Sequence, residues 1–121
     1  GLVQNAAEVG AYLQQRMAET FNDHPLVGDT RGVGLLHALE FSSDKLRRAH
    51  FDPNLKVGPQ IAAACLEQGL IARAMPHGDI LGFAPPLIAN RNDIDTIVDK
   101  AHQAVNKVMD NLVTSKQWQP K

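Results

Sequence analysis

The sequence predicts an α+β fold, a two-layer sandwich in which helices cover a short, mostly antiparallel sheet. Segments whose apolar residues recur every three or four positions, as in helices, alternate with short apolar runs that are typical of strands. Turns rich in glycine, proline or asparagine separate these segments, and 121 residues are enough for one compact core. We find no internal repeat and no low-complexity segment, so one domain is expected.

The first half of the chain is predicted to form a helix and then one strand. The helix covers residues 2–21 and ends at the turn 22–25. After glycines that mark a turn, residues 33–41 alternate as in a strand whose two faces are both largely covered. The charged stretch 42–54 has no periodicity and is predicted to be a loop. One face of the helix carries the apolar residues Leu2, Ala6, Val9, Leu13 and Met17.

A short helix and a hairpin are predicted next. Pro59 suits a first helical turn and Gly69 suits a helix end, so these two residues bound the helix. Residues 70–84 are predicted to form a hairpin with a broad loop, whose strands are 70–72 and 80–84. The two prolines that follow end the second strand, because proline cannot donate a hydrogen bond to a neighbouring strand.

The last predicted helix has the clearest pattern. Asn90 and Asp93 are spaced as a helix cap and its partner in the first turn. Residues 113–121 are polar and are expected to form a frayed tail. The apolar residues that follow helical spacing are Ile94, Ile97, Val98, Ala101, Val105, Val108 and Leu112.

Composition and charge exclude several classes of function. Twelve basic and thirteen acidic residues give a net charge of −1, so neither nucleic acid nor a membrane surface is an expected partner. No run of about 20 apolar residues and no signal peptide is found, and the expected location is the cytoplasm. The single cysteine, Cys65, excludes an internal disulfide and fits a reducing compartment.

Histidine and glycine patterns give little support for a catalytic or metal site. His37 is expected to be a partly buried strand histidine whose ring is satisfied, and Cys65 is expected to pack in the core. His77 lies in a turn and is a candidate for a site contact, with a solvated turn as the alternative. Residues 31–34 read RGVG, but a strand rather than a helix follows, so a phosphate loop is not favoured. No metal site is expected, because the five histidines lack ligand spacing: His24, His37, His50, His77 and His102.

Arg73 is the one residue whose position predicts a binding role. It follows the apolar run 70–72 and has no acidic neighbour in the sequence. A planar guanidinium near the end of a strand is suited to bind a carboxylate through two parallel hydrogen bonds. A structural ion pair is the alternative.

Three motifs in a fixed order carry a resemblance to a known family. Residues 27–36 read VGDTRGVGLL, residues 69–73 read GLIAR, and residues 78–87 read GDILGFAPPL. In this order they resemble the C-terminal small domain of class III aminotransferases, the pyridoxal-phosphate enzymes of fold type I that include amine:pyruvate and ω-amino acid transaminases. The resemblance covers residues 1–112, of which residues 1–22 would be the end of the interdomain helix region.

The resemblance implies a longer parent enzyme that transfers amino groups with pyridoxal 5′-phosphate. The first methionine is Met17, and the chain is expected to be a fragment that lacks the large domain. In the family the lysine that binds the cofactor lies in that domain, so this chain is expected to hold no catalytic or cofactor-binding residue, to bind no cofactor and to be inactive alone. None of the chain's lysines matches that position: Lys45, Lys56, Lys100, Lys107, Lys116 and Lys121.

The resemblance also gives Arg73 a role. It matches the arginine that, in amine:pyruvate transaminases, binds the substrate carboxylate and swings out for apolar amines. The ornithine branches instead carry an arginine at the position of Gly82, so the donor is expected to be an amine or ω-amino acid and the acceptor pyruvate or a similar keto acid.

Contacts with other protein surfaces are expected as well. The resemblance implies a homodimer, or self-association through the surface that the large domain would cover, with Leu2, Val9 and Leu13 as candidates for that surface. The alternative is a small ligand-binding or dimerisation module without catalysis.

Overall fold

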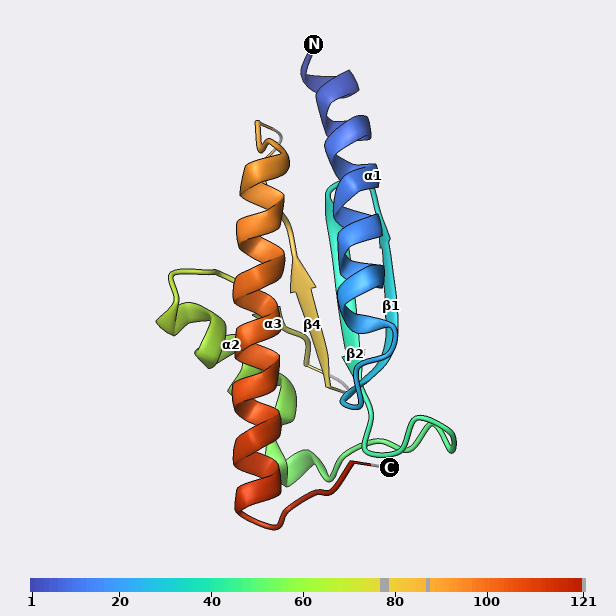
Figure 1. Ribbon diagram of the computed structural model, residues 1–121, viewed down its shortest axis with the longest axis vertical. Coiled ribbons are helices and arrows are strands. Elements are labelled where there is room, and N and C mark those ends of the chain that lie inside the picture. Colours follow the sequence, from blue (N-terminus) through green and yellow to red (C-terminus); the bar gives the residue numbers. More distant parts are fainter. Residues whose placement is uncertain (77–78, 87, 121) are drawn as a thin grey trace.

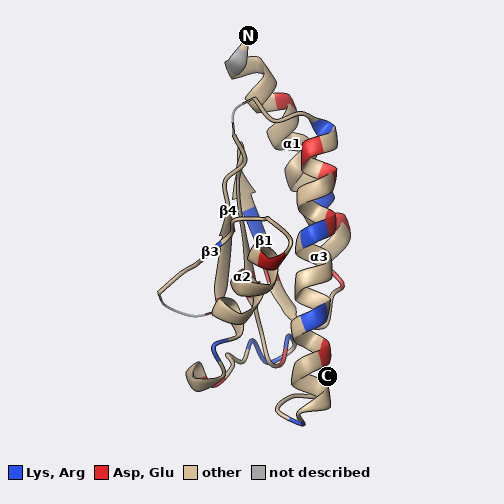
Figure 2. Ribbon diagram, turned by 90° about the vertical axis from the view of Figure 1, so that its left-hand side faces the viewer, with Lys and Arg blue, Asp and Glu red and all other residues tan. Residues whose placement is uncertain are grey.

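The chain folds as the predicted α+β sandwich of two layers. The structure, a computed structural model, describes residues 1–76, 79–86 and 88–120. Within these residues three α-helices pack on one face of an antiparallel four-stranded sheet of order β1-β2-β4-β3 (Figures 1 and 2). None of the described helices is long and apolar enough to cross a membrane. The elements are α1 (Leu2–Phe21), β1 (Val27–Val33), β2 (Leu36–Phe41), the 3-10 helix η1 (Pro53–Leu55), α2 (Val57–Glu67), β3 (Arg73–Ala74), β4 (Ile80–Phe83) and α3 (Arg91–Thr114).

Helices α1 and α3 lie side by side and confirm the two long helices that the sequence predicts (Figure 1). At the start of α3 the Asn90 side chain accepts a hydrogen bond from the Asp93 N–H, and the Asp93 carboxylate accepts one from the Asn90 N–H. This reciprocal cap satisfies two backbone donors that the helix leaves free. The two helices are joined at Asp95, which accepts hydrogen bonds from the Tyr12 hydroxyl and the Arg16 guanidinium.

The predicted single strand over 33–41 is wrong, because the chain reverses at Gly34. Strands β1 and β2 form a tight hairpin in which Val33 faces Leu36. Gly34 has a φ of +56°, a conformation that glycine adopts at little cost. The Gln14 side chain of α1 donates to the Gly34 and Leu36 carbonyls and so holds the turn against the helix. The apolar alternation runs through the turn, which is why it looks like one long strand.

Helix α2 and the β3–β4 hairpin confirm the predicted order of elements with one displaced strand. The helix ends at Glu67, and Gly69, two residues further on, has a φ of +78°. The Leu70 N–H still bonds to the Cys65 carbonyl of the helix, so the chain is not free to form a strand until Arg73. The predicted strand 70–72 is therefore wrong by position, while its antiparallel pairing with β4 is correct. His77 lies outside the described residues.

The core lies between the sheet and the helices. Cys65 is fully buried as predicted, and burial raises the pKa of its thiol to about 11. Val9 and Leu13 are also buried, so the expectation that they lie on an exposed surface is wrong. Both face inward because α1 packs along the sheet and α3, while nothing is described of the Leu2 side chain. The largest fully buried residues include Phe21, Phe41, Leu13, Met17, Leu26, Leu39, Ile61, Leu81, Ile94 and Leu112.

The expected frayed tail is wrong for Trp118. This side chain is 7% exposed, its ring lies 5.9 Å from the Phe51 ring, and its Nε1–H donates to the Ser43 carbonyl at 2.7 Å. Burial of a large aromatic ring outweighs the entropy cost of ordering the few residues that follow α3. The tail therefore closes over the loop that joins β2 to α2.

Candidate functional site

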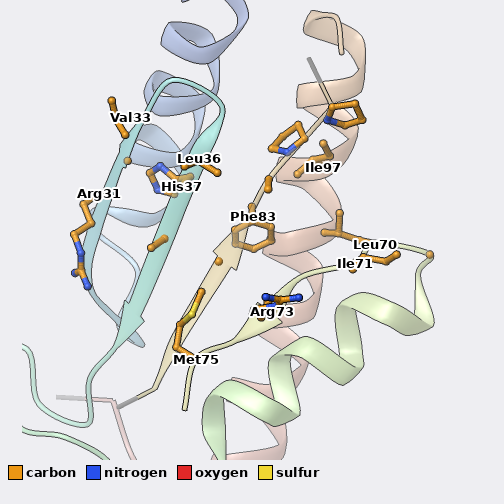
Figure 3. Close-up of a pocket in the computed structure, with 17 residues that line it drawn as sticks. Arg31, Val33, Leu36, His37, Leu70, Ile71, Arg73, Met75, Phe83 and Ile97 are labelled. Atoms are coloured by element: carbon orange, nitrogen blue, oxygen red, sulfur yellow. The ribbon is translucent and has the colours of Figure 1, made fainter. Parts of the chain in front are cut away.

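The two faces of the sheet differ in what covers them. Successive residues of a strand point to opposite faces, so Leu39 and Leu81 face the helices while Ala38 and Gly82 face the other side. No described helix covers that other side, which we call the open face (Figure 2). A cavity of about 960 Å³ with a mainly apolar lining lies at the sheet, and open-face residues form much of it (Figure 3).

One row of residues crosses the open face through all four strands. Strand register places Arg31 opposite Ala38, Ala38 opposite Gly82, and Gly82 opposite Arg73. The two central residues have the smallest side chains of all residue types, so no bulky group rises from the middle of the row. The two end residues carry guanidinium groups. A Cβ atom at Gly82 would lie 2.7 Å from Met75 Cε, which places the end of Met75 over this glycine.

The Arg73 side chain lies on the edge strand β3 and is exposed. Its guanidinium has no hydrogen bond or ion pair to another described residue, so the structural ion pair gains no support in that part of the chain. A free guanidinium offers five N–H donors in a planar fork that matches a carboxylate. The geometry therefore suits the carboxylate-binding role, which stays a prediction.

Arg31 is the cavity residue that sequence reasoning missed. Its Nη1 donates to Asp29 Oδ2 at 2.9 Å and to Glu40 Oε2 at 3.2 Å. These hydrogen bonds, that to Asp29 first, raise the pKa of the guanidinium above its usual value. The signal in the sequence was the alternation of Asp29, Arg31 and Val33, which places them on one face of an edge strand.

His37 is only partly satisfied, which corrects the sequence-based expectation. The residue is 4% exposed, and its Nδ1 bonds to Gln14 Oε1 while its Nε2 is buried with no partner among the described residues. Because the Gln14 amide nitrogen already donates to two carbonyls, its oxygen accepts and Nδ1 carries the proton. Burial lowers the pKa of His37 to about 4, so the ring is neutral at pH 7.

Metal-ligating side chains do not cluster in the part of the chain that the structure describes, where no group of three histidine, cysteine, aspartate or glutamate residues could hold an ion. Three of the described histidines, His24, His37 and His102, make other contacts instead. His24, for example, bonds to Asn106 Oδ1 and accepts from the Leu26 N–H.

The comparison with known families shows to which family the chain belongs. Residues 1–105 match the family described as aminotransferase class-III. The chain therefore belongs to the class III aminotransferases, and its α+β fold agrees with the resemblance that the three motifs carry.

Individual relatives give the same result. The chain is 63% identical over 112 residues to the diaminobutyrate–2-oxoglutarate transaminase of Halomonas elongata. The matched region covers 93% of this chain and 24% of that protein. It is 39% identical over 101 residues to the putrescine–pyruvate aminotransferase of Pseudomonas aeruginosa, covering 84% of this chain and 21% of that protein. The chain thus spans about a quarter of the length of these relatives.

Solved structures of transaminases also superpose on this chain. A transaminase obtained by ancestral reconstruction superposes with a TM-score of 0.90 at 68% identity, over 92% of this chain and 24% of that one. The omega transaminase of Pseudomonas jessenii, solved in complex with PMP, superposes with a TM-score of 0.83 at 37% identity, over 90% of this chain and 23% of that one.

The described residues do not fit an anchor for the pyridoxal-phosphate cofactor. No lysine and no acidic residue lines the cavity in the described part of the chain. Lys45 donates to the Asn22 and His24 carbonyls, and Lys107 pairs with Glu67, both away from the cavity. A lysine that forms a covalent bond with an aldehyde must reach it unpaired. No step through the cofactor is therefore assigned to this chain.

Proposed function

We propose that the protein to which this chain belongs is a pyridoxal-phosphate-dependent aminotransferase that moves an amino group from an amine or ω-amino acid to pyruvate or a similar keto acid. Membership of the class III family supports this proposal, as do relatives named for a diamine or diamino acid and for a keto acid. Residues outside this chain would hold the cofactor. The observation that carries the proposal is the free guanidinium of Arg73 beside an apolar cavity.

The chain's own part in this reaction is to recognise the substrate carboxylate. The keto acid presents a carboxylate to Arg73, and two parallel hydrogen bonds fix its orientation. The side chain stands on a two-residue edge strand, where it can change rotamer without disturbing the core. When it withdraws, the cavity offers the amine a surface that is mainly apolar, and Gly82 adds no side chain opposite it.

We further propose the position of this chain in the whole protein. Residues 1–112 form the C-terminal small domain, of which residues 1–22 are the end of the interdomain helix region. The protein is a homodimer in the cytoplasm. Exposed apolar side chains near the cavity, Val33, Leu36 and Ile71, support a surface that the rest of the protein or a second copy covers.

The test is to measure both half-reactions of the full-length protein with Arg73→Ala. We expect kcat/KM for pyruvate to fall about 100-fold, because a charged hydrogen-bonded pair is lost. The value for an apolar amine should change less than about 3-fold, since that substrate makes no use of the charge. The control is Arg47→Ala, an arginine that is 86% exposed and does not line the cavity.

Three outcomes would contradict the proposal. Equal losses with pyruvate and with the amine would overturn the two positions of Arg73. An unchanged value for pyruvate would show that the carboxylate binds elsewhere. A full-length parent that binds these substrates without any amino transfer would favour the alternative, a binding module.

A further inference from the structure

Met75 lies on the open face of the sheet and lines the same cavity as Arg73 (Figure 3). Its N–H donates to the Ile80 carbonyl at 2.9 Å, which continues the antiparallel pairing of β3 with β4 by one residue. Because side chains alternate along a strand, Met75 and Arg73 point to the same side. The end of the Met75 side chain reaches across to Gly82, where a Cβ atom would lie 2.7 Å from its Cε. The thioether therefore forms part of the cavity surface beside the arginine.

The three methionines of the chain differ in their exposure. Met17 is fully buried in the core and Met109 packs against the core, whereas Met75 is 36% exposed. The cavity that Met75 lines, about 960 Å³, is large enough to admit hydrogen peroxide. Oxidation of methionine requires that the oxidant reach the sulfur, so we expect Met75 to react before the other two.

The single cysteine of the chain does not compete for the oxidant. Cys65 is fully buried, and burial raises the pKa of its thiol to about 11. The thiolate is the reactive form of cysteine, so this thiol is inert at pH 7. A thioether has no proton to lose, and its reaction with peroxide does not depend on such an ionisation.

From this geometry we infer that Met75 is a site of reversible oxidation by peroxide, and that its sulfoxide lowers the use of an apolar amine. The sulfur attacks one oxygen of hydrogen peroxide, the O–O bond breaks and an S–O bond forms. The departing hydroxide takes the proton of the transferred hydroxyl group and leaves as water. The sulfur loses two electrons and the peroxide gains them. The inference rests on the proposed function, which keeps this cavity open to small molecules in the whole protein.

Oxidation changes the surface that the cavity offers to a substrate. A sulfoxide is polar and carries a hydrogen-bond acceptor, whereas the thioether is apolar. An apolar amine that packs there leaves this oxygen without a hydrogen-bond partner, at a cost in binding. The oxygen also stands on the same face as the guanidinium of Arg73, but a neutral acceptor competes poorly with a substrate carboxylate. The amine should therefore lose more than the keto acid.

Mass spectrometry of the full-length protein tests the site of oxidation. Trypsin cleaves after lysine and arginine, so the three methionines fall into separate peptides, 17–31, 74–91 and 108–116. After brief treatment with hydrogen peroxide, peptide 74–91 should gain one oxygen atom at least about 5-fold faster than peptide 17–31. The buried Met17 is thus a control within the same molecule. Equal rates in these two peptides would overturn the inference.

Kinetics of both half-reactions test the effect of the sulfoxide. In the full-length parent, treatment should lower kcat/KM for an apolar amine about 10-fold and that for pyruvate less than about 3-fold. Methionine sulfoxide reductases should restore the value for the amine. Met75→Gln, whose amide is also polar, should show a reduced value for the amine before any treatment.

The oxidation-resistant variant is Met75→Leu, which cannot form a sulfoxide. Peroxide should change its kcat/KM for the amine by less than about 2-fold relative to the same variant without treatment. A loss as large as that of the parent would overturn the inference and leave the proposed function intact. A parent that transfers no amino group before treatment would overturn the proposed function, and with it the effect on the amine.

Discussion

The two faces of the sheet come from the same strands but from opposite kinds of residue. On the face under the helices, Leu39 and Leu81 are completely buried. On the open face lie their sequence neighbours Ala38 and Gly82, and Arg73 is opposite Gly82. Alternation along a strand thus places core residues on one face and, on the other, the residue that we propose binds the substrate. Substitutions on the open face should therefore change ligand binding without unfolding the chain.

The largest effect should come from the covered face. Leu81→Ala leaves a cavity in the core between β4 and the helices, and we expect the free energy of unfolding to fall by about 4 kcal/mol. Urea denaturation of the 121-residue chain measures this loss. The matched control is Ile71→Ala, whose side chain is 83% exposed and whose change should stay within about 0.5 kcal/mol. Similar losses at both positions would show that the two faces contribute equally to stability.

The pH dependence of stability should reveal His37, a polar residue that is buried on the covered face. The pKa of His37 falls from 6.5 in the unfolded chain to about 4 in the fold, so between these values the unfolded state binds more protons. Stability is therefore lost as the pH falls from 7 towards 4, by about 3 kcal/mol for this residue. Burial also lowers the pKa of His24, which adds a loss in the same direction.

The measurement is the free energy of unfolding at several pH values between 7 and 4. His37→Gln should flatten the profile, because glutamine does not titrate in this range. His50→Gln serves as the matched control, because it makes the same substitution at an exposed side chain. A His37→Gln profile as steep as that of the parent would contradict the buried, neutral ring.

The smallest effect on stability should come from Gly82, in the middle of the open face. Gly82→Ala brings a methyl group against Met75 Cε, the movable end of a flexible side chain, while alanine costs less entropy than glycine in a strand. We expect these effects to leave the free energy of unfolding within about 0.5 kcal/mol of the parent. A loss above about 1.5 kcal/mol, measured by urea denaturation, would show that the open face also supports the fold.

Most of the fold follows from periodicity, and the exceptions have local causes. The helices 2–21 and 94–112 were predictable because one apolar face repeats along them. The β1–β2 turn was not, because Gly34 reverses the chain inside an unbroken alternation, and the Gln14 side chain that holds the turn is remote in sequence. The docking of Trp118 was likewise hidden, since its partners lie about 70 residues away.

The site was predictable only in part. Arg73 stood out because it follows an apolar run without an acidic neighbour. Its place in a row with Arg31 depends on strand order, which brings β1 and β3 to opposite edges of one sheet and cannot be read from either segment alone. The buried Nε2 of His37, which has no partner among the described residues, was equally hidden, because the ring is held by Gln14, which lies far away in the sequence.

The docked tail has an optical consequence. Trp118 is the only tryptophan in the chain, and its indole is held against Phe51 with its N–H on Ser43. Intrinsic fluorescence excited at the indole band therefore reports one contact, that between the end of α3 and the loop after β2. A shift of emission to longer wavelength would signal that this closure has opened, even while the sheet and its arginine row stay folded.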